Sequence, residues 1–149
     1  MSVALTKSRA LNALRCYGNY ALSLFGLVRI THMPTFVSVE PANVCQLRCP
    51  ECPVGNGKRL EVRGDRLMSR EVWKRVLAEV KDTAHTIQFY FQGEPLLNPD
   101  LPQMVREAHE AGLYTITSTN AQALTPAMAE ALTHAGLDRI IVSMDGLTD

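Results

Sequence analysis

The stretch Glu40-Pro-Ala-Asn-Val-Cys45-Gln-Leu-Arg-Cys49-Pro-Glu-Cys52-Pro-Val-Gly-Asn-Gly57 decides how the rest of this 149-residue chain is interpreted. Its three cysteines have the spacing C-x3-C-x2-C. The prolines and glycines between and beside them interrupt helices and strands, so the stretch predicts a loop. The loop runs for roughly 28 residues before the next helix signal at Ser69, and loops of that length are usually functional or disordered.

The number of cysteines bears on the kind of metal centre. A structural zinc site normally has four protein ligands, and a [4Fe–4S] cluster normally takes four thiolates, one on each iron. Three thiolates would leave one iron open to a substrate or cofactor. The spacing also fits a zinc loop with Cys16 or His32 as a distant fourth ligand, or three unrelated thiols. Spacing alone leaves these alternatives open.

Outside the loop, short β-branched or aromatic runs alternate with amphipathic segments that have helix caps. This alternation predicts an α/β fold in which parallel strands are joined by helical crossovers. The expected strands are 35–39, 86–91, 113–117 and 139–143, and the expected helices begin at Ser69, at Asn98 or Asp100, and at Thr125. Polar motifs follow each strand, and the carboxyl ends of parallel strands meet at one edge. The motifs should therefore converge in space.

The cysteine motif resembles the cluster motif of the radical S-adenosylmethionine (radical SAM) enzymes. Three later segments resemble motifs of that family in the same order, and the resemblance covers about residues 35 to 149. They are Gln92-Gly93-Glu94-Pro95, which is similar to Gly-Gly-Glu-Pro, Ser118-Thr119-Asn120, which is similar to a Thr-Asn turn, and Ser143-Met144-Asp145-Gly146, which is similar to Ser-x-Asp. Two positions depart from the pattern: Glu51 stands where an aromatic residue is common, and Gln92 replaces the first glycine.

The resemblance implies a partial (β/α) barrel. Only about four of its expected six βα units are visible, so we expect residues 35–149 to be a truncated radical SAM core domain. Residues 1–34 are expected to form an N-terminal helical segment. Relatives of this kind often carry a C-terminal auxiliary-cluster (SPASM-like) domain. The fourth strand is expected to be an open edge.

The resemblance also implies the chemistry. Cys45, Cys49 and Cys52 would bind a [4Fe–4S] cluster, and S-adenosylmethionine would bind the open iron and be cleaved reductively to a 5′-deoxyadenosyl radical that abstracts hydrogen. No side chain is expected to act as an acid, base or nucleophile. The substrate would be an unknown peptide or small molecule, and the electron donor a flavodoxin or ferredoxin. Alternatives are a zinc-binding module or a catalytically incomplete fragment that keeps the cluster. The expected cofactor-binding residues are Glu51, Gly93, Glu94, Asn120, Ser143 and Asp145.

Composition and charge limit the binding partners and the cellular compartment that we expect for this chain. The formal net charge is zero, so nothing indicates nucleic-acid binding. Cysteines that ligate metal must stay reduced, which favours the cytoplasm. Residues 1–39 contain four basic residues and no acidic ones, but the apolar run at 20–28 is too short for stable membrane insertion. We expect an amphipathic helix here that packs its apolar stripe beside the main domain, with Cys16 buried in it. The stripe is Leu11, Leu14, Leu22 and Phe25.

Overall fold

The computed structural model describes residues 5–56 and 66–144, which form a four-stranded parallel sheet with helical crossovers. The strands lie in the order β1-β2-β3-β4, which is their order along the chain. The predicted α/β class and the partial barrel are therefore confirmed. The elements are α1 (Lys7–Ser23), β1 (Phe36–Val39), α2 (Arg70–Val80), β2 (Thr86–Phe89), the 3-10 helix η1 (Pro95–Leu97), α3 (Leu101–Glu110), β3 (Tyr114–Thr119), α4 (Pro126–His134) and β4 (Arg139–Val142).

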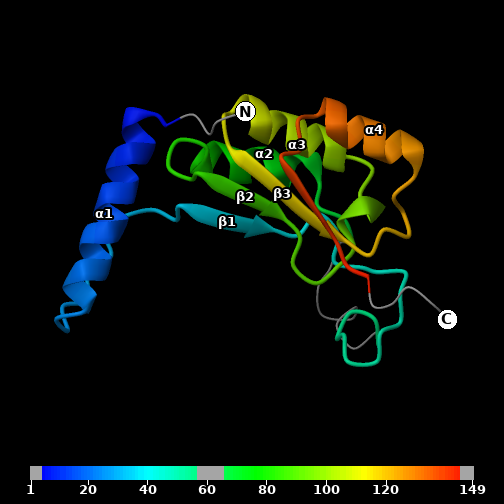
Figure 1. Ribbon diagram of the computed structural model, residues 1–149, viewed down its shortest axis with the longest axis horizontal. Coiled ribbons are helices and arrows are strands. Elements are labelled where there is room, and N and C mark those ends of the chain that lie inside the picture. Colours follow the sequence, from blue (N-terminus) through cyan, green and yellow to red (C-terminus); the bar gives the residue numbers. More distant parts are fainter. Residues whose placement is uncertain (1–4, 57–65, 145–149) are drawn as a thin grey trace.

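Helices α2, α3 and α4 form one layer on one face of the sheet (Figure 1). Each connects two neighbouring parallel strands, so every crossover steps in the same direction along the sheet. This arrangement is that of a barrel wall, in contrast to doubly wound sheets, which have helices on both faces. Among the described residues β4 pairs with β3 alone, and its Ile140 and Val142 are exposed, as expected for an open edge.

Local signals set the helix ends. The side chains of Ser69 and Thr125 accept the N–H groups of Val72 and Met128, the standard N-cap arrangement. Gly112 has a φ of 74°, in the left-handed region where glycine commonly ends a helix. Asn98 lies before α3, and its Oδ1 accepts the N–H of Asp100. The helix starts expected at Ser69 and Thr125 are confirmed.

The hydrophobic core lies between the helix layer and the sheet. Trp73 of α2 is fully buried, and its ring centroid is 5.3 Å from that of Phe89 on β2. Ile87 points to the same side as Phe89 because alternate strand residues share a face. Helix α3 adds Leu101, Met104, Val105 and Ala108 to this buried cluster. This core holds the strands in register, so their carboxyl ends are fixed relative to one another.

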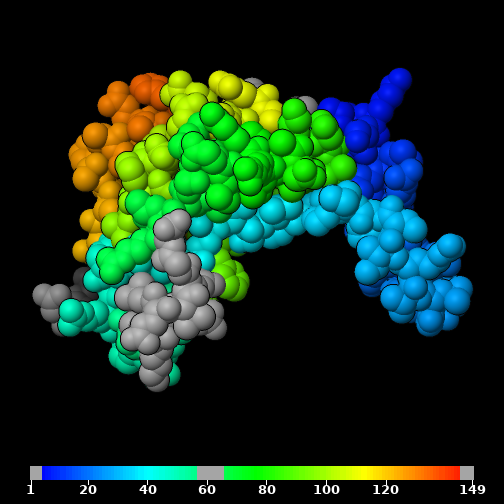
Figure 2. Space-filling model, turned by 180° about the vertical axis from the view of Figure 1, so that it is seen from behind, coloured from blue at the N-terminus to red at the C-terminus, as the bar shows by residue number. Residues whose placement is uncertain are grey.

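Helix α1 stands at the amino-terminal end of the strands, and the cysteine loop lies at the opposite end (Figures 1 and 2). The expected packing of its apolar stripe is wrong. Leu14 and Phe25 are 69% and 81% exposed, whereas Asn12 and Asn19 are buried. Asn12 binds the backbone of Met33 in both directions and also donates to the carbonyl of Thr83. The helix is thus attached by hydrogen bonds from its polar face, and Cys16 is half-buried, not buried.

Arg9 provides the main attachment of α1. Its guanidinium is buried and donates to the carbonyls of Lys81, Ala111 and Gly112 at 2.6, 2.7 and 2.7 Å. Lys81 and Ala111 are the C-caps of α2 and α3. One cation therefore satisfies the carbonyls that two helix ends leave without intrahelical partners. Burial lowers the pKa of Arg9, and the charge of Asp82 opposes this change.

Candidate functional site

The cysteine loop and the carboxyl ends of β2, β3 and β4 enclose a cavity of about 210 Å³. All three motif cysteines line it, although they differ in exposure. The segments singled out in the sequence therefore converge as expected. The other lining residues are Leu47, Tyr90, Phe91, Gln92, Gly93, Glu94, Ser118, Thr119, Asn120 and Ser143.

The start of the cysteine loop is hydrogen-bonded directly to the segment after β2. Oε1 of Glu40 accepts the backbone N–H groups of Gln92 and Gly93, both at 3.0 Å. The carbonyl of Val44, next to the first cysteine, accepts the N–H of Glu94 at 2.8 Å. Gln92 is not in the left-handed region, so the glycine that it replaces is not needed there for its conformation. These bonds fix where the loop leaves the sheet.

Gly93 is required for space. A Cβ at this position would lie 1.9 Å from the carbonyl oxygen of Ala42 and 3.0 Å from the Cα of Asn43. Both neighbours are backbone atoms, so no side-chain rotation could make room. Gly93 thus lets the backbone of the cysteine loop lie close to the segment after β2.

Glu94 is buried, and its carboxylate connects β3 to the segment after β2 through hydrogen bonds. Its Oε1 accepts from the hydroxyl of Thr119 at 2.6 Å and from the N–H of Leu96 at 3.1 Å. Its Oε2 accepts the N–H of Asn120 at 2.9 Å. A buried carboxylate is costly unless it is hydrogen-bonded, and these three donors supply that requirement. Glu94 therefore positions the end of β3, including Asn120, at the cavity.

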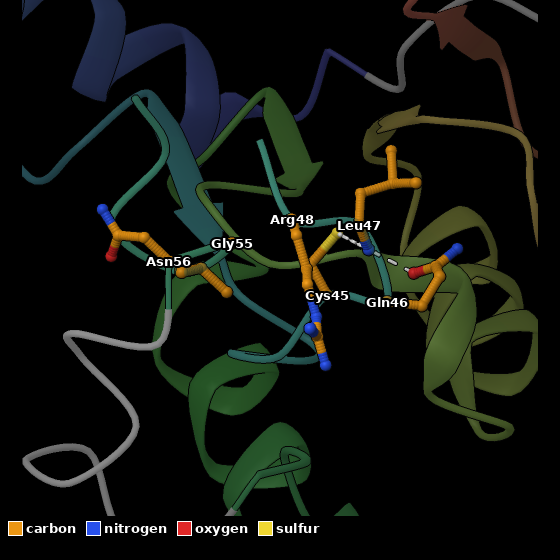
Figure 3. A pocket seen from close by; sticks show the side chains of 7 residues that line it. Cys45, Gln46, Leu47, Arg48, Gly55 and Asn56 are labelled. Atoms are coloured by element: carbon orange, nitrogen blue, oxygen red, sulfur yellow. Dashed lines mark hydrogen bonds between the residues drawn. The ribbon is translucent and has the colours of Figure 1, made fainter. Parts of the chain in front are cut away.

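Cys45 receives two hydrogen bonds on its sulfur. The backbone N–H of Leu47 and the side-chain Nδ2 of Asn120 each lie 3.4 Å from Sγ. As a thiol, Cys45 also donates to Oε1 of Gln46 at 3.8 Å, and Figure 3 shows the bonds to Leu47 and Gln46 as dashed lines. Hydrogen-bond donors that point at a cysteine sulfur stabilise it when it serves as a metal ligand.

A second hollow of about 550 Å³ is also lined by Cys45, together with Gln46, Leu47, Arg48, Val54, Gly55 and Asn56 (Figure 3). Gly55 lines it and packs closely on the loop itself, since a Cβ there would be 2.8 Å from the nitrogen of Cys49. Cys52 donates its N–H to the carbonyl of Cys49 at 3.1 Å, and Asn56 donates its own to Cys52 at 3.0 Å. The loop thus forms successive tight turns around the cysteines.

The remaining expected site residues have different positions. Glu51 is exposed and does not line the 210 Å³ cavity, although it lies between two cysteines that do. Ser143 lines the cavity, and its N–H donates to the carbonyl of Thr119 at 2.9 Å. Asp145 lies outside the described residues.

The structure places Cys16 and His32, the two residues suggested as a distant fourth zinc ligand, away from the cysteine loop. Cys16 lies beside Phe36 and Thr86 at the start of β1 and β2, and His32 contacts Asn19 of α1. Both lie at the end of the sheet away from the cysteine loop, so neither can be the fourth zinc ligand. Within residues 5–56 and 66–144, no three His, Cys, Asp or Glu side chains are gathered closely enough to hold one ion.

Sequence reasoning assigned no role to two residues that build the site, although Thr119 belongs to a motif it singled out. Glu40 accepts two backbone donors from the segment after β2, and Thr119 donates to Glu94. Both stand directly at a strand end, and Glu40 is the acid that ends an otherwise acid-free region. A polar residue directly at the end of a strand was the sequence signal that could have identified both.

Comparisons with known proteins agree with this geometry. The family model described as "Radical SAM superfamily" matches residues 39–149. PqqA peptide cyclase from Rhodopseudomonas palustris is 39% identical over 115 residues, which cover 76% of this chain and 29% of that protein. AdoMet-dependent heme synthase from Methanosarcina barkeri is 32% identical over 120 residues, covering 80% and 34%. The structure of BtrN in complex with AdoMet and 2-DOIA superposes with a TM-score of 0.62 at 26% identity, covering 79% and 49%.

The chain is an α/β protein with a parallel barrel wall and a three-cysteine loop at the carboxyl ends of its strands. The chain belongs to the radical SAM superfamily. It spans about a third of the length of these two curated relatives. None of the helices in the described ranges combines the length and hydropathy needed to cross a bilayer.

Proposed function

We propose that this chain is part of a radical SAM enzyme and holds its [4Fe–4S] cluster through Cys45, Cys49 and Cys52. The single observation that carries the proposal is the cavity in which these cysteines meet the ends of β2, β3 and β4. The fit is supported by the two donors on the Cys45 sulfur and by Gly93, which lets the loop approach the sheet. When bound, the cluster supplies one electron that cleaves S-adenosylmethionine to a 5′-deoxyadenosyl radical.

The protein's own residues orient these groups. We assign Gly93, Glu94, Asn120 and Ser143 to the S-adenosylmethionine side of the cavity, because each lines it. Glu94 has its carboxylate bound to the end of β3, so its part is to position the neighbouring donors. Glu51 would contribute through its backbone beside Cys52. Asp145 is assigned on the sequence pattern alone.

The substrate is proposed as a peptide or a small molecule. The name PqqA peptide cyclase supports a peptide, and the BtrN complex with 2-DOIA supports a small molecule. A flavodoxin or ferredoxin is proposed as the electron donor, since a cluster of this kind takes up one electron at a time. The setting is proposed to be the reducing cytoplasm, because the cysteines must be thiolates to bind iron. We also propose a division between an N-terminal helical segment (1–34) and a truncated radical SAM core domain (35–149), which the start of β1 at Phe36 supports.

The test uses the full-length protein, reconstituted with iron and sulfide without oxygen. We expect about four irons per chain and a reduced EPR spectrum that changes when S-adenosylmethionine is added. Dithionite should then yield 5′-deoxyadenosine. Cys45→Ala, Cys49→Ala and Cys52→Ala should each lose the cluster. Cys16→Ala is the matched control, because Cys16 lies at the far end of the sheet and should not affect iron content.

Each contrary result has a distinct meaning. One zinc per chain and a silent spectrum would replace the proposal with a zinc module. A cluster whose spectrum ignores S-adenosylmethionine, with no 5′-deoxyadenosine formed, would support the catalytically incomplete alternative. Retention of the cluster by all three motif variants would refute the assignment of its ligands.

A further inference from the structure

Asn120 links two parts of the chain that are 75 residues apart in sequence. It follows β3, and its Nδ2 lies 3.4 Å from the sulfur of Cys45 in the cysteine loop. Its contact is with the proposed ligand itself. This contact suggests a role for Asn120 that the family pattern did not indicate.

The orientation of the Asn120 amide is fixed by its other partners. Its Oδ1 accepts from Nε2 of Gln46 at 3.1 Å and from the backbone N–H of Gln122 at 3.0 Å. An amide has one acceptor end and one donor end. Reversing it would place its NH2 group against the backbone N–H of Gln122, so the NH2 group faces the sulfur of Cys45.

The backbone around Asn120 is held just as firmly. Its N–H donates to the buried carboxylate of Glu94 at 2.9 Å. The next residue, Ala121, has a φ of 61°, and among the described residues it is the one non-glycine in the left-handed region. Such a conformation costs about 1–2 kcal/mol for an L-residue and tends to occur at functional sites. The N–H of Ala121 donates to the hydroxyl of Thr119 at 3.0 Å, which helps to hold the turn.

A donor on a cysteine ligand affects the cluster's redox equilibrium. Reduction adds one negative charge, part of which resides on the ligating sulfurs. A hydrogen bond to such a sulfur therefore stabilises the reduced cluster more than the oxidised one, and reduction potentials of iron–sulfur sites depend on these bonds. The N–H of Leu47 is a backbone donor that every side-chain substitution retains. Asn120 is the donor that the sequence can vary.

We propose that Asn120 is a positioning residue that raises the reduction potential of the cluster through its hydrogen bond to Cys45. The inference rests on the proposed function, because it requires Cys45 to be a ligand. It predicts that Asn120 makes reduction by a biological donor easier before S-adenosylmethionine binds. Its effect is therefore present without that cofactor, whereas a role limited to cofactor contact would appear only with it.

The test is a potentiometric EPR titration of the full-length, reconstituted protein in the absence of S-adenosylmethionine. Asn120→Leu removes the donor at similar size, and Asn120→Asp keeps the shape but faces the sulfur with an oxygen. We expect Asn120→Leu to lower the ratio of reduced to oxidised cluster about tenfold at a fixed potential, equivalent to about 59 mV for one electron. Asn120→Asp should lower it further. Gln122→Ala is the control, because its backbone N–H remains and its side chain is exposed.

Iron content is measured on every variant. An unchanged potential in either Asn120 variant with full iron would overturn the inference, as would an equal shift in Gln122→Ala. If both Asn120 variants lose the cluster while the wild type keeps it, Asn120 serves assembly and the tuning role is wrong. Absence of a cluster in the wild type is a failure of the proposed function itself, and it removes the basis of this inference as well.

Discussion

Replacing Gly93 with alanine tests how the cysteine loop is attached to the sheet. The new Cβ would lie 1.9 Å from the Ala42 carbonyl oxygen and 2.7 Å from its carbon, so the two segments must separate. Overpacking of this kind costs about 1–3 kcal/mol. Separation also breaks the bonds from Gln92 and Gly93 to Glu40 and from Glu94 to Val44, each worth about 1 kcal/mol net. These contributions sum to about 4–6 kcal/mol, and we take the lower end, about 4 kcal/mol, which is a large part of a typical domain stability of about 5–15 kcal/mol.

The assay combines urea denaturation with iron analysis. For a slope of about 2 kcal/mol/M, Gly93→Ala should lower the unfolding midpoint by about 2 M. It should also lose most of its cluster, because the loop that carries the cysteines is displaced. Gly18→Ala is the matched control. Gly18 lies inside α1 with nothing within 4 Å of the new Cβ, so alanine should stabilise the helix by up to about 1 kcal/mol. A Gly93→Ala protein with the wild-type midpoint and wild-type iron would refute this reasoning.

Two further predictions concern the fold. Arg9→Ala should lower the free energy of unfolding by about 3 kcal/mol, because the bonds to Lys81, Ala111 and Gly112 are lost, and Arg9→Lys should restore little of it since lysine lacks the guanidinium fork. Arg15 is exposed, so Arg15→Ala serves as the comparison in the same denaturation experiment. An equal loss in the free energy of unfolding for the two variants would contradict the role of Arg9 at the two helix ends. Burial by itself raises the pKa of Glu107, but hydrogen bonds from Arg70, Gln103 and Trp73 and the charge of Arg70 hold that pKa below its ordinary value of 4.5. Its carboxylate therefore stabilises the fold above pH 4.5, and this contribution is lost as the pH falls through the lower folded value. Stability measured against pH should fall less steeply below pH 4.5 in Glu107→Gln, and identical slopes would count against the prediction.

Much of the fold could be predicted because its signals are local. Ser69 and Thr125 cap the helices that follow them, and Gly112 ends α3, through contacts that span only a few residues. Strand runs and helical periodicity gave the alternation that a parallel sheet requires. The clustering of three cysteines in one loop is likewise a property of the sequence. The order of these elements was enough to expect the motifs at one edge of the sheet.

The orientation of α1 could not be predicted from periodicity. Its apolar stripe is real, but Leu14 and Phe25 are exposed while Asn12 and Arg9 are buried. The reason is that Arg9 meets two helix ends which come together only after α2 and α3 have packed. An apolar stripe shows that a helix has two faces. Which face is buried depends on the partners available to each.

The sequence by itself determined the cysteine loop, the α/β alternation and the helix ends, because each depends on residues close together in the chain. The tertiary structure alone decided that Gly93 makes room for Ala42, that Glu94 holds the end of β3, and that Asn120 faces the sulfur of Cys45. The hydrogen bond from Asn120 to Glu94 joins residues 26 positions apart, and the one from Asn120 to Cys45 joins residues 75 positions apart. They depend on the register of parallel strands and on the packing of the core beneath them, and no local pattern encodes that register.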